Sequence, residues 1–328
     1  MPLDRRRSLR IALGAALAPA LLPARAPAQT PSPPSPPSSP EASLPPTLDE
    51  LVRLDLTEDP ARRLRAPVRV NGRGPFPFMV DTGADTSVVS VELAAALGLE
   101  SAGFARVNGI AGSRVAPRAH VAELQVGGRS VRRVKAPLLA REHMGALGII
   151  GLDCLHDQRV DIDFRRNRMA VRPSKKEPAD PGAIVVYGKT RFGRLILVDS
   201  TVRREPVYVV LDTGAQDTIG NAALHALLNR RRRARLVDPA VAVELASATG
   251  QTVGGRLDRM EELTLGGVRV VGVPVVYADL HTFRVYKLVD EPALMLGMNT
   301  LRSFRGLNID FGRREVAFDL PEDAFGIG

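Results

Sequence analysis

The sequence predicts a mostly β protein built from two similar lobes. Its 328 residues are enough for two domains of ordinary size. An apolar run that ends in Asp-Thr-Gly-Ala occurs at 78–84 and again at 209–215, with the two aspartates 131 positions apart (212 minus 81). Short apolar runs separated by Gly and Asn turns surround both copies, and helical patterns are few. One β-rich unit is therefore expected twice in the chain.

The first 28 residues have the pattern of an export signal. Four arginines lie between positions 5 and 10, an apolar stretch follows at 11–22, and Ala26-Pro27-Ala28 resembles a cleavage site. The stretch is too short to span a bilayer, so we expect no stable membrane insertion after cleavage. Ser8 stands where a twin-arginine signal usually has a bulky apolar residue, which leaves the Sec and twin-arginine routes both open. We expect an exported, periplasmic protein; a disordered basic N-terminus is the alternative.

Two breaks divide the remainder. Residues 29–47 are rich in Pro and Ser and too poor in apolar side chains to pack, which predicts a disordered linker. Residues 173–182 combine Pro with charged side chains and predict a linker between lobes. The N-terminal lobe is then 48–172 and the C-terminal lobe is 183–328.

The elements of the first lobe follow one another in a readable order. Residues 68–70 alternate in polarity, Asn71-Gly72 favours a hairpin turn, and the strand at 76–80 leads into the first Asp-Thr-Gly turn. A helical pattern at 91–97 comes next. A strand, a turn at Gly127-Gly128 and another Val-rich strand complete the series.

The second lobe repeats this order. A strand at 195–198 is followed by a polar turn at 203–206 and by the strand at 207–211 that precedes the second Asp-Thr-Gly. A helical pattern at 221–228 and a turn at Gly266-Gly267 follow. Each lobe then has a Gly-containing apolar segment followed by a strand pair. In the first lobe these are 147–155 and the pair entered at 162–164, and in the second lobe 294–301 and the pair entered at 309–311.

Composition excludes several classes of function. Trp is absent and aromatic residues make up only 4%, which leaves few platforms for stacking bases, so nucleic acid is not an expected partner. Removing residues 1–28 takes away five Arg and one Asp, and the formal charge of +9 falls to +5. The single cysteine, Cys154, has apolar neighbours typical of a buried structural thiol.

Metal and cofactor motifs are also missing from the sequence. The five histidines show no spacing typical of metal ligands, and no dinucleotide loop or nucleophile elbow occurs. We therefore expect neither metal nor organic cofactor. A basic run at 230–233 with Arg235 ends a helical pattern. We expect it to complement the helix dipole on a solvated face, and binding of a polyanion is the alternative.

The paired motifs resemble those of the retropepsin-like aspartic proteases, joined in tandem as in the pepsin-like branch. The resemblance covers residues 64–172 and 184–320 and implies two acid-protease lobes that form a bilobal pseudo-dimer with a central cleft. It rests on four segments, Asp81-Thr82-Gly83-Ala84-Asp85, Asp212-Thr213-Gly214-Ala215, Ile149-Ile150-Gly151 and Met295-Leu296-Gly297.

The resemblance implies an aspartic endopeptidase that acts on peptides or proteins. Asp81 and Asp212 would be the catalytic pair, sharing one proton and activating water with no covalent intermediate, and either can be the protonated member. Six neighbours would support the pair, with the threonines hydrogen-bonded across the interface and the glycines allowing close approach: Thr82, Gly83, Ala84, Thr213, Gly214 and Ala215. Because neither alanine can donate a hydroxyl proton to an aspartate, we expect activity to extend toward neutral pH.

Substrate contacts are expected from Asp85 and from a covering flap. The flap candidate is Gly109-Ile110-Ala111-Gly112, with a counterpart at 247–250; a plain hairpin turn would look much the same. The chain departs from the retroviral pattern in lacking the Arg after the companion Gly, where it has Leu152 and Met298. Gln216 also replaces the acid found at Asp85.

Two alternatives remain beside the protease. A non-catalytic peptide-binding or scaffold protein could retain the fold, although two intact Asp-Thr-Gly turns argue against it. The halves could also pair with another chain instead of with each other. We expect pairing within one chain and a monomer.

Overall fold

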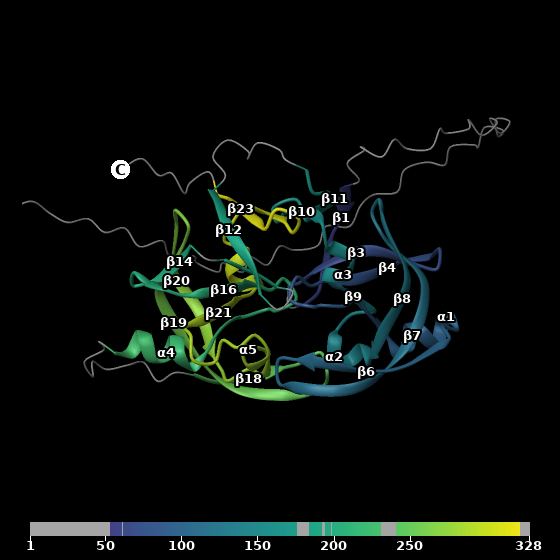
Figure 1. The fold of residues 1–328 in the computed structure, drawn as a ribbon, viewed down its shortest axis with the longest axis horizontal. Helices are drawn as coiled ribbons and strands as arrows, with labels where there is room; N and C mark the ends of the chain where they lie inside the picture. Colours follow the sequence, from purple (N-terminus) through teal and green to yellow (C-terminus); the bar gives the residue numbers. More distant parts are fainter. Residues whose placement is uncertain are drawn as a thin grey trace, which may run out of the picture. The chain divides into compact units, whose positions relative to one another are not determined.

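The computed structural model describes residues 53–60, 62–175, 184–191, 194–197, 199–230 and 241–321, which belong to the unit that follows position 47. The signal peptide predicted at 1–28, the linker predicted at 29–47 and most of the linker predicted at 173–182 lie outside these ranges. Strands dominate the described residues, and the longest helix there has eight residues (Figure 1). No described helix is long and apolar enough to cross a membrane.

Within its described residues the first lobe contains eleven strands and three short helices. Eight of the strands form one sheet in the order β2-β3-β4-β9-β5-β8-β7-β6. The strands are β1 (Arg53–Asp55), β2 (Thr57–Glu58), β3 (Leu64–Val70), β4 (Arg73–Val80), β5 (Val88–Ser90), β6 (Ser101–Gly109), β7 (Gly112–Val126), β8 (Arg129–Leu139), β9 (Gly148–Ile150), β10 (Gln158–Asp163) and β11 (Arg168–Pro173). The helices are α1 (Val91–Leu97), α2 (Arg141–Met144) and α3 (Leu152–Leu155).

The second lobe has the same kinds of element. Its strands are β12 (Ile184–Arg191), β13 (Arg194–Leu197), β14 (Ser200–Val202), β15 (Glu205–Pro206), β16 (Tyr208–Leu211), β17 (Thr218–Gly220), β18 (Val241–Ala246), β19 (Thr252–Leu265), β20 (Val268–Tyr277), β21 (Ala293–Leu296), β22 (Gly306–Asp310) and β23 (Glu315–Asp319). Its helices are α4 (Ala222–Asn229), α5 (His281–Val285) and α6 (Met298–Leu301).

Strand pairing shows that the duplication is structural. In the first lobe β4 and β9 pair in parallel, β9 and β5 antiparallel, and β5 and β8 in parallel. In the second lobe β16 and β21, then β21 and β17, then β17 and β20 repeat these three directions. The mostly β, two-lobed fold predicted from the repeat is therefore correct.

A sheet shared by both lobes joins them. The strand order β1-β11-β10-β22-β23-β12 takes three strands from each lobe, and β10 pairs antiparallel with β22 at the junction. Along that junction Arg159 lies opposite Asp310 and Asp163 lies opposite Gly306. The strand β11 continues to Pro173, which is the first residue of the predicted linker.

Local signals explain the hairpins that precede the two Asp-Thr-Gly turns. Asn71 and Gly72 have φ angles of 50° and 76° between β3 and β4, as a two-residue hairpin of the primed type requires. The corresponding turn between β14 and β15 has Arg203 and Arg204 at 53° and 69°. Because arginine rarely adopts positive φ, strand pairing around this turn must hold a conformation that its own sequence does not favour.

The two longer helices lie where the sequence predicts them. The helix α1 begins after Ser90, whose hydroxyl accepts the N–H of Leu93, and ends at Gly98 in the left-handed conformation. The helix α4 begins after Asn221, whose side chain accepts the N–H of Leu224. The basic run predicted at its end lies outside the described residues except for Arg230.

Candidate active site

Parallel strand pairs position the two candidate aspartates at equivalent points. In the first lobe Val80 of β4 lies opposite Ile150 of β9, and the N–H of Asp81 donates to the carbonyl of Ile150 at 3.0 Å. In the second lobe the N–H of Asp212 donates to the carbonyl of Leu296 at 3.1 Å. The companion motifs β9 and β21 therefore fix the turn that carries each carboxylate.

The glycine of each turn lies against the carboxylate of the other lobe. A Cβ added to Gly83 would lie 2.7 Å from Cγ of Asp212. A Cβ added to Gly214 would lie 2.3 Å from Cγ of Asp81. Neither distance leaves room for a side chain, so the structure brings the two carboxylates together across the lobe interface and requires glycine at both positions.

The two threonines of the turns hydrogen-bond across the interface, as expected. The Thr82 hydroxyl donates to the carbonyl of Leu211 at 2.9 Å and accepts the N–H of Thr213 at 3.2 Å. The Thr213 hydroxyl donates to the carbonyl of Val80 at 2.8 Å and accepts the N–H of Thr82 at 3.1 Å. Both threonines are buried, and the four bonds hold the turns in one reciprocal arrangement.

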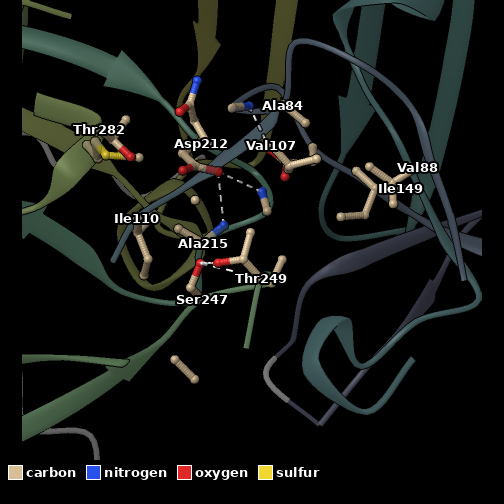
Figure 2. Close-up of a pocket in the computed structure, with 18 of the residues that line it drawn as sticks. Ala84, Val88, Val107, Ile110, Ile149, Asp212, Ala215, Ser247, Thr249 and Thr282 are labelled. Carbon is tan, nitrogen blue, oxygen red and sulfur yellow. Dashed lines mark hydrogen bonds between the residues drawn. The ribbon is translucent and has the colours of Figure 1, made fainter. Parts of the chain in front are cut away.

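Backbone amides point at both carboxylates. The N–H groups of Gly214 and Ala215 both donate to Oδ1 of Asp212 at 3.0 Å (Figure 2). The N–H of Gly83 donates to Oδ1 of Asp81 at 2.7 Å. Asp212 is buried and Asp81 is half-buried, so the pair sits at a boundary between protein interior and cavity.

Main-chain hydrogen bonds hold the Asp-Thr-Gly-Ala loops at Leu152 and Met298, the positions where the retroviral pattern has an Arg and this chain does not. At the start of α3 the N–H groups of Leu152 and Asp153 donate to the carbonyls of Ala84 and Asp85, at 2.8 and 3.2 Å. The second lobe repeats both bonds at 2.9 Å, from Met298 to Ala215 and from Asn299 to Gln216. The absent ion pair is thus replaced by the first amides of a short helix.

Polar side chains behind the first loop were not predicted from the sequence. The Asp153 carboxylate accepts the Ser87 N–H at 2.9 Å and the Ser87 hydroxyl at 2.6 Å. The same hydroxyl accepts the N–H of Gly151 at 3.0 Å and lies 3.3 Å from Sγ of Cys154. Cys154 is fully buried, and burial raises the pKa of its thiol to about 12, so this cysteine stays protonated and unreactive.

The hydrogen bonds of Asp153 with Ser87 anchor the first loop, and the second lobe has an equivalent anchor made of neutral side chains. Oδ1 of Asn299 accepts the N–H of Thr218 at 3.0 Å and its hydroxyl at 2.7 Å. The Thr218 hydroxyl also contacts that of Thr300 at 2.7 Å and accepts the N–H of Gly297 at 3.1 Å. A signal existed in the sequence, because Ser87 and Thr218 both stand six residues after the Asp (87 minus 81, 218 minus 212).

A cavity of about 520 Å³ contains the two aspartates. Figure 2 shows Ile110 and Thr282 on one side of Asp212, and Val88 and Ile149 on the other. The lining takes residues from both lobes, and its apolar members are Met79, Val88, Leu139, Ile149, Ile219, Val285, Tyr286 and Met295, among others. A cavity of this size and lining suits an extended peptide segment.

Two hairpin tips meet at the cavity. Gly109 at the end of β6 and Ile110 in the turn that follows line it, together with Ser247 and Thr249 from the turn between β18 and β19. A Cβ on Gly109 would lie 2.2 Å from Oγ of Ser247, so the tips touch. The carbonyl of Ile110 also accepts the N–H of His281 at 2.8 Å, which attaches the first tip to α5 of the opposite lobe.

Of the remaining residues predicted to contact substrate, one lines the cavity and two do not. Asp85 is exposed and lines the cavity. Ala111 and Gly112 belong to the same tip as Ile110 but do not line it. Gly112 instead lies against Gln251 of the second hairpin, where an added Cβ would be 3.0 Å from Oε1.

One further carboxylate in the cavity stands out. Asp217 is half-buried, and burial raises the pKa of its carboxyl above the ordinary value. The sequence did not single it out, because an Asp in a turn is common. Among the described residues no three His, Cys, Asp or Glu side chains are grouped so as to hold a metal ion.

Comparison with protein families matches both halves of the chain. Residues 66–157 match the family model described as gag-polyprotein putative aspartyl protease. Residues 198–300 match the model described as aspartyl protease. Each matched region contains one Asp-Thr-Gly-Ala turn and one companion motif. None of the curated proteins compared with the chain matches it.

Proposed function

The chain belongs to the aspartyl proteases, with one family segment in each half, and from this premise we propose that it is an aspartic endopeptidase whose water nucleophile is activated between Asp81 and Asp212. The observation that carries the proposal is the reciprocal contact of Gly83 and Gly214 with the opposite carboxylates. Two carboxylates this close cannot both ionise cheaply, so the pair holds one proton over a range of pH.

The proposed reaction needs only these two groups and water. The ionised carboxylate takes a proton from water, the water oxygen attacks the peptide carbonyl, and the protonated carboxyl donates a hydrogen bond to the carbonyl oxygen. The tetrahedral diol then collapses as the leaving nitrogen receives a proton. No covalent enzyme intermediate forms, and no metal or organic cofactor takes part.

The frame around the pair supports this role. The four hydrogen bonds of Thr82 and Thr213 keep the turns from separating, and the N–H donors of Gly83, Gly214 and Ala215 orient the carboxylates. Preorganised groups of this kind avoid reorganisation during the reaction, which is where enzymes gain most of their rate.

A peptide substrate would lie in the cavity beneath the two hairpin tips. Gly109 and Ile110 of the first tip line this cavity, and so does Asp85, which supports their proposed contacts with substrate. An extended segment bound with chain continuing at both ends is cut internally, which makes the enzyme an endopeptidase.

The test compares residues 47–328 with the variants Asp81→Asn and Asp212→Asn on a peptide library between about pH 4 and 7.5, the range that the pair's expected titration covers. Each variant should lose cleavage by about 100-fold or more, with its thermal unfolding still cooperative. Asp290→Asn is the matched control, because Asp290 is exposed and outside the cavity. If either dyad variant cleaves as well as wild type, the mechanism is wrong.

The scaffold alternative predicts a different result in the same experiment. Peptides would bind to wild type and to both Asn variants with similar affinity, and none would be cut. Two Asp-Thr-Gly turns facing one another favour the enzyme, since a binding protein has no need of paired carboxylates.

We further propose that one chain forms the whole site and acts as an exported monomer. Sedimentation of active protein measures this directly, and a dimer that loses activity on dilution would contradict it. For export, the N-terminal sequence of protein recovered from the periplasm should begin after Ala28. Recovery only from the cytoplasm, with the first 28 residues intact, would overturn that part.

A further inference from the structure

The two halves of the cavity differ in charge at equivalent positions. Gly151 lies against the backbone of Thr86, where an added Cβ would be 2.7 Å from the carbonyl carbon. Gly297 lies in the same way against Asp217, at 2.5 Å. Thr86 and Asp217 are therefore structural counterparts, and both line the cavity. The first lobe has a neutral side chain at this position and the second lobe has an acid.

The hairpins carry a second such pair. Arg106 on β6 and Glu244 on β18 each stand three residues before the point where the tips touch (109 minus 106, 247 minus 244). Both line the cavity and both are exposed. The same position thus carries a cation in the first lobe and an anion in the second.

The charges of the first lobe already have partners within the chain. Arg106 donates to the Ser113 hydroxyl at 3.0 Å, and Arg63, which also lines the cavity, pairs with Asp59 at 2.6 Å. Asp85 likewise has an interaction partner. Within the described part of the chain, neither Asp217 nor Glu244 has a hydrogen-bond or ion-pair partner for its carboxylate.

Asp217 is also held firmly in place. Its backbone packs on Gly297, and the next residue, Thr218, is bonded to Asn299 through both its N–H and its hydroxyl. A half-buried carboxylate loses water contacts without gaining a counter-charge, and burial raises its pKa accordingly. Such a group gains free energy when a cation enters beside it, and perturbed carboxylates of this kind occur often at functional sites.

We propose that Asp217, assisted by Glu244, selects substrates that place a Lys or Arg side chain in the second-lobe half of the cavity. This inference rests on the proposed protease function and adds its substrate class. The preference is one-sided: a basic residue favours cleavage on one side of the scissile bond over the mirror position, where Thr86 offers no charge and the neighbouring acid, Asp85, already has a partner within the chain.

The experiment scans one Lys through the four positions on each side of the scissile bond in a fluorogenic peptide and replaces it by Gln in the matched peptide. For wild type, kcat/KM should be about fivefold to tenfold higher with Lys than with Gln at one position on one side, as a partly shielded ion pair contributes about 1 kcal/mol. The ratio should fall with added salt. A ratio near one at every position overturns the inference.

Substitutions test whether Asp217 is the residue that causes the preference for Lys. Asp217→Asn, which keeps the shape of the side chain, should bring the Lys-to-Gln ratio close to one, and the exchange Asp217→Thr with Thr86→Asp should move the preference to the mirror position across the scissile bond. Glu205→Gln removes one exposed charge from the same lobe outside the cavity and should leave the ratio unchanged. An unchanged ratio in Asp217→Asn overturns the role of this residue.

Failure of the proposed function gives a separate result. If wild type cleaves neither the Lys nor the Gln peptide, the endopeptidase proposal fails, and fluorescence anisotropy of the same two labelled peptides still measures the selection. Tighter binding of the Lys peptide that is lost in Asp217→Asn supports the inference. Equal affinities overturn it.

Discussion

The two lobes agree closely where they meet and differ where they face the cavity. At the interface each contributes a Gly against the opposite carboxylate and a Thr hydroxyl in the same two hydrogen bonds. Behind the loops, Asp153 does in the first lobe what Asn299 does in the second. On the cavity wall the first lobe has Thr86 at the position where the second lobe has Asp217. Symmetry is kept where two halves must fit one another, and it is lost where only the ligand constrains them.

The strongest test of the shared frame adds one methyl group to each glycine. Gly214→Ala and Gly83→Ala would put Cβ 2.3 and 2.7 Å from the opposite carboxylate, and displacement of a catalytic group by about 1 Å costs roughly 100-fold in rate. We expect kcat to fall at least that far in both, and further for Gly214. Gly254→Ala is the control, because an added Cβ there meets nothing within 4 Å. Activity within threefold of wild type in either variant would contradict this, because it would mean that the turns can move apart without displacing the carboxylates.

A second test removes the threonine hydroxyls one at a time. Thr82→Val and Thr213→Val each lose one donated and one accepted hydrogen bond in a buried site, so the free energy of unfolding should fall by about 2 kcal/mol or more. Urea denaturation measures this, with Thr57→Val on an exposed strand as control. The double variant should lose less unfolding free energy than the two single variants lose together, since the two hydroxyls share one hydrogen-bond network. Additive losses would mean that the two halves of the network act independently.

The contact between hairpin tips can be disturbed and then restored. Gly109→Ala places Cβ 2.2 Å from Oγ of Ser247, which should separate the tips and raise KM about tenfold. Ser247→Gly in the same chain removes the nearest clashing atom, leaves Oγ1 of Thr249 at 2.8 Å, and should restore part of the affinity. Steady-state kinetics on one neutral peptide compares the three proteins. A KM that does not respond in the single variant would place the tips outside the binding step.

The one-sided charge predicts a pH dependence with a definite sign. Because burial raises the pKa of Asp217, its carboxyl is neutral below that raised value and ionised above it. The Lys-to-Gln ratio should therefore be near one in acid and rise with pH through the raised pKa, while Lys stays protonated. The folded state also binds this proton more tightly than the unfolded state, so ionisation above the ordinary pKa lowers stability and Asp217→Asn removes that loss. A ratio independent of pH would contradict the assignment.

The smallest effect is expected from a substitution that makes the anchor of the first loop, Asp153, resemble that of the second, Asn299. Asp153→Asn keeps an oxygen that can accept the Ser87 N–H and hydroxyl, as Asn299 does for Thr218, and should change stability by less than about 1 kcal/mol. Asp153→Ala removes both acceptors and should cost about 2 kcal/mol. Thermal and urea unfolding give both values. Equal losses would mean that the negative charge, and not the acceptor geometry, holds the first loop.

Much of this fold could be predicted because its signals are local. Asn71-Gly72, the strand before each Asp and the helices capped by Ser90 and Asn221 depend on residues a few positions apart. A single Asp-Thr-Gly is weak evidence for a catalytic site, and its second occurrence in the same order of elements made the prediction specific. The family resemblance also predicted hydrogen bonds between Thr82 and Thr213, and the structure contains them.

The parts that could not be predicted depend on distance in the sequence. The helices α2, α3, α5 and α6 have four or five residues, too few to show a helical period. Ser87 and Asp153 are 66 residues apart, and nothing marks an isolated Ser and Asp as partners. The junction of β10 with β22 links segments of different lobes and follows from tertiary packing. Expected activity toward neutral pH, from Ala84 and Ala215, stays a prediction for a rate profile; one confined below about pH 4 would contradict it.

The strands β10 and β22 pair two lobes that belong to one polypeptide, where two separate subunits could have met in the same way, and this changes how the cavity can evolve. In a symmetric homodimer every codon is expressed on both sides of the shared site, so a mutation that improves one side alters the other as well. Here each half has its own codons. A new charge at Asp217 alters one wall and leaves its counterpart at Thr86 untouched, so natural selection can adjust the two sides of the cleft separately.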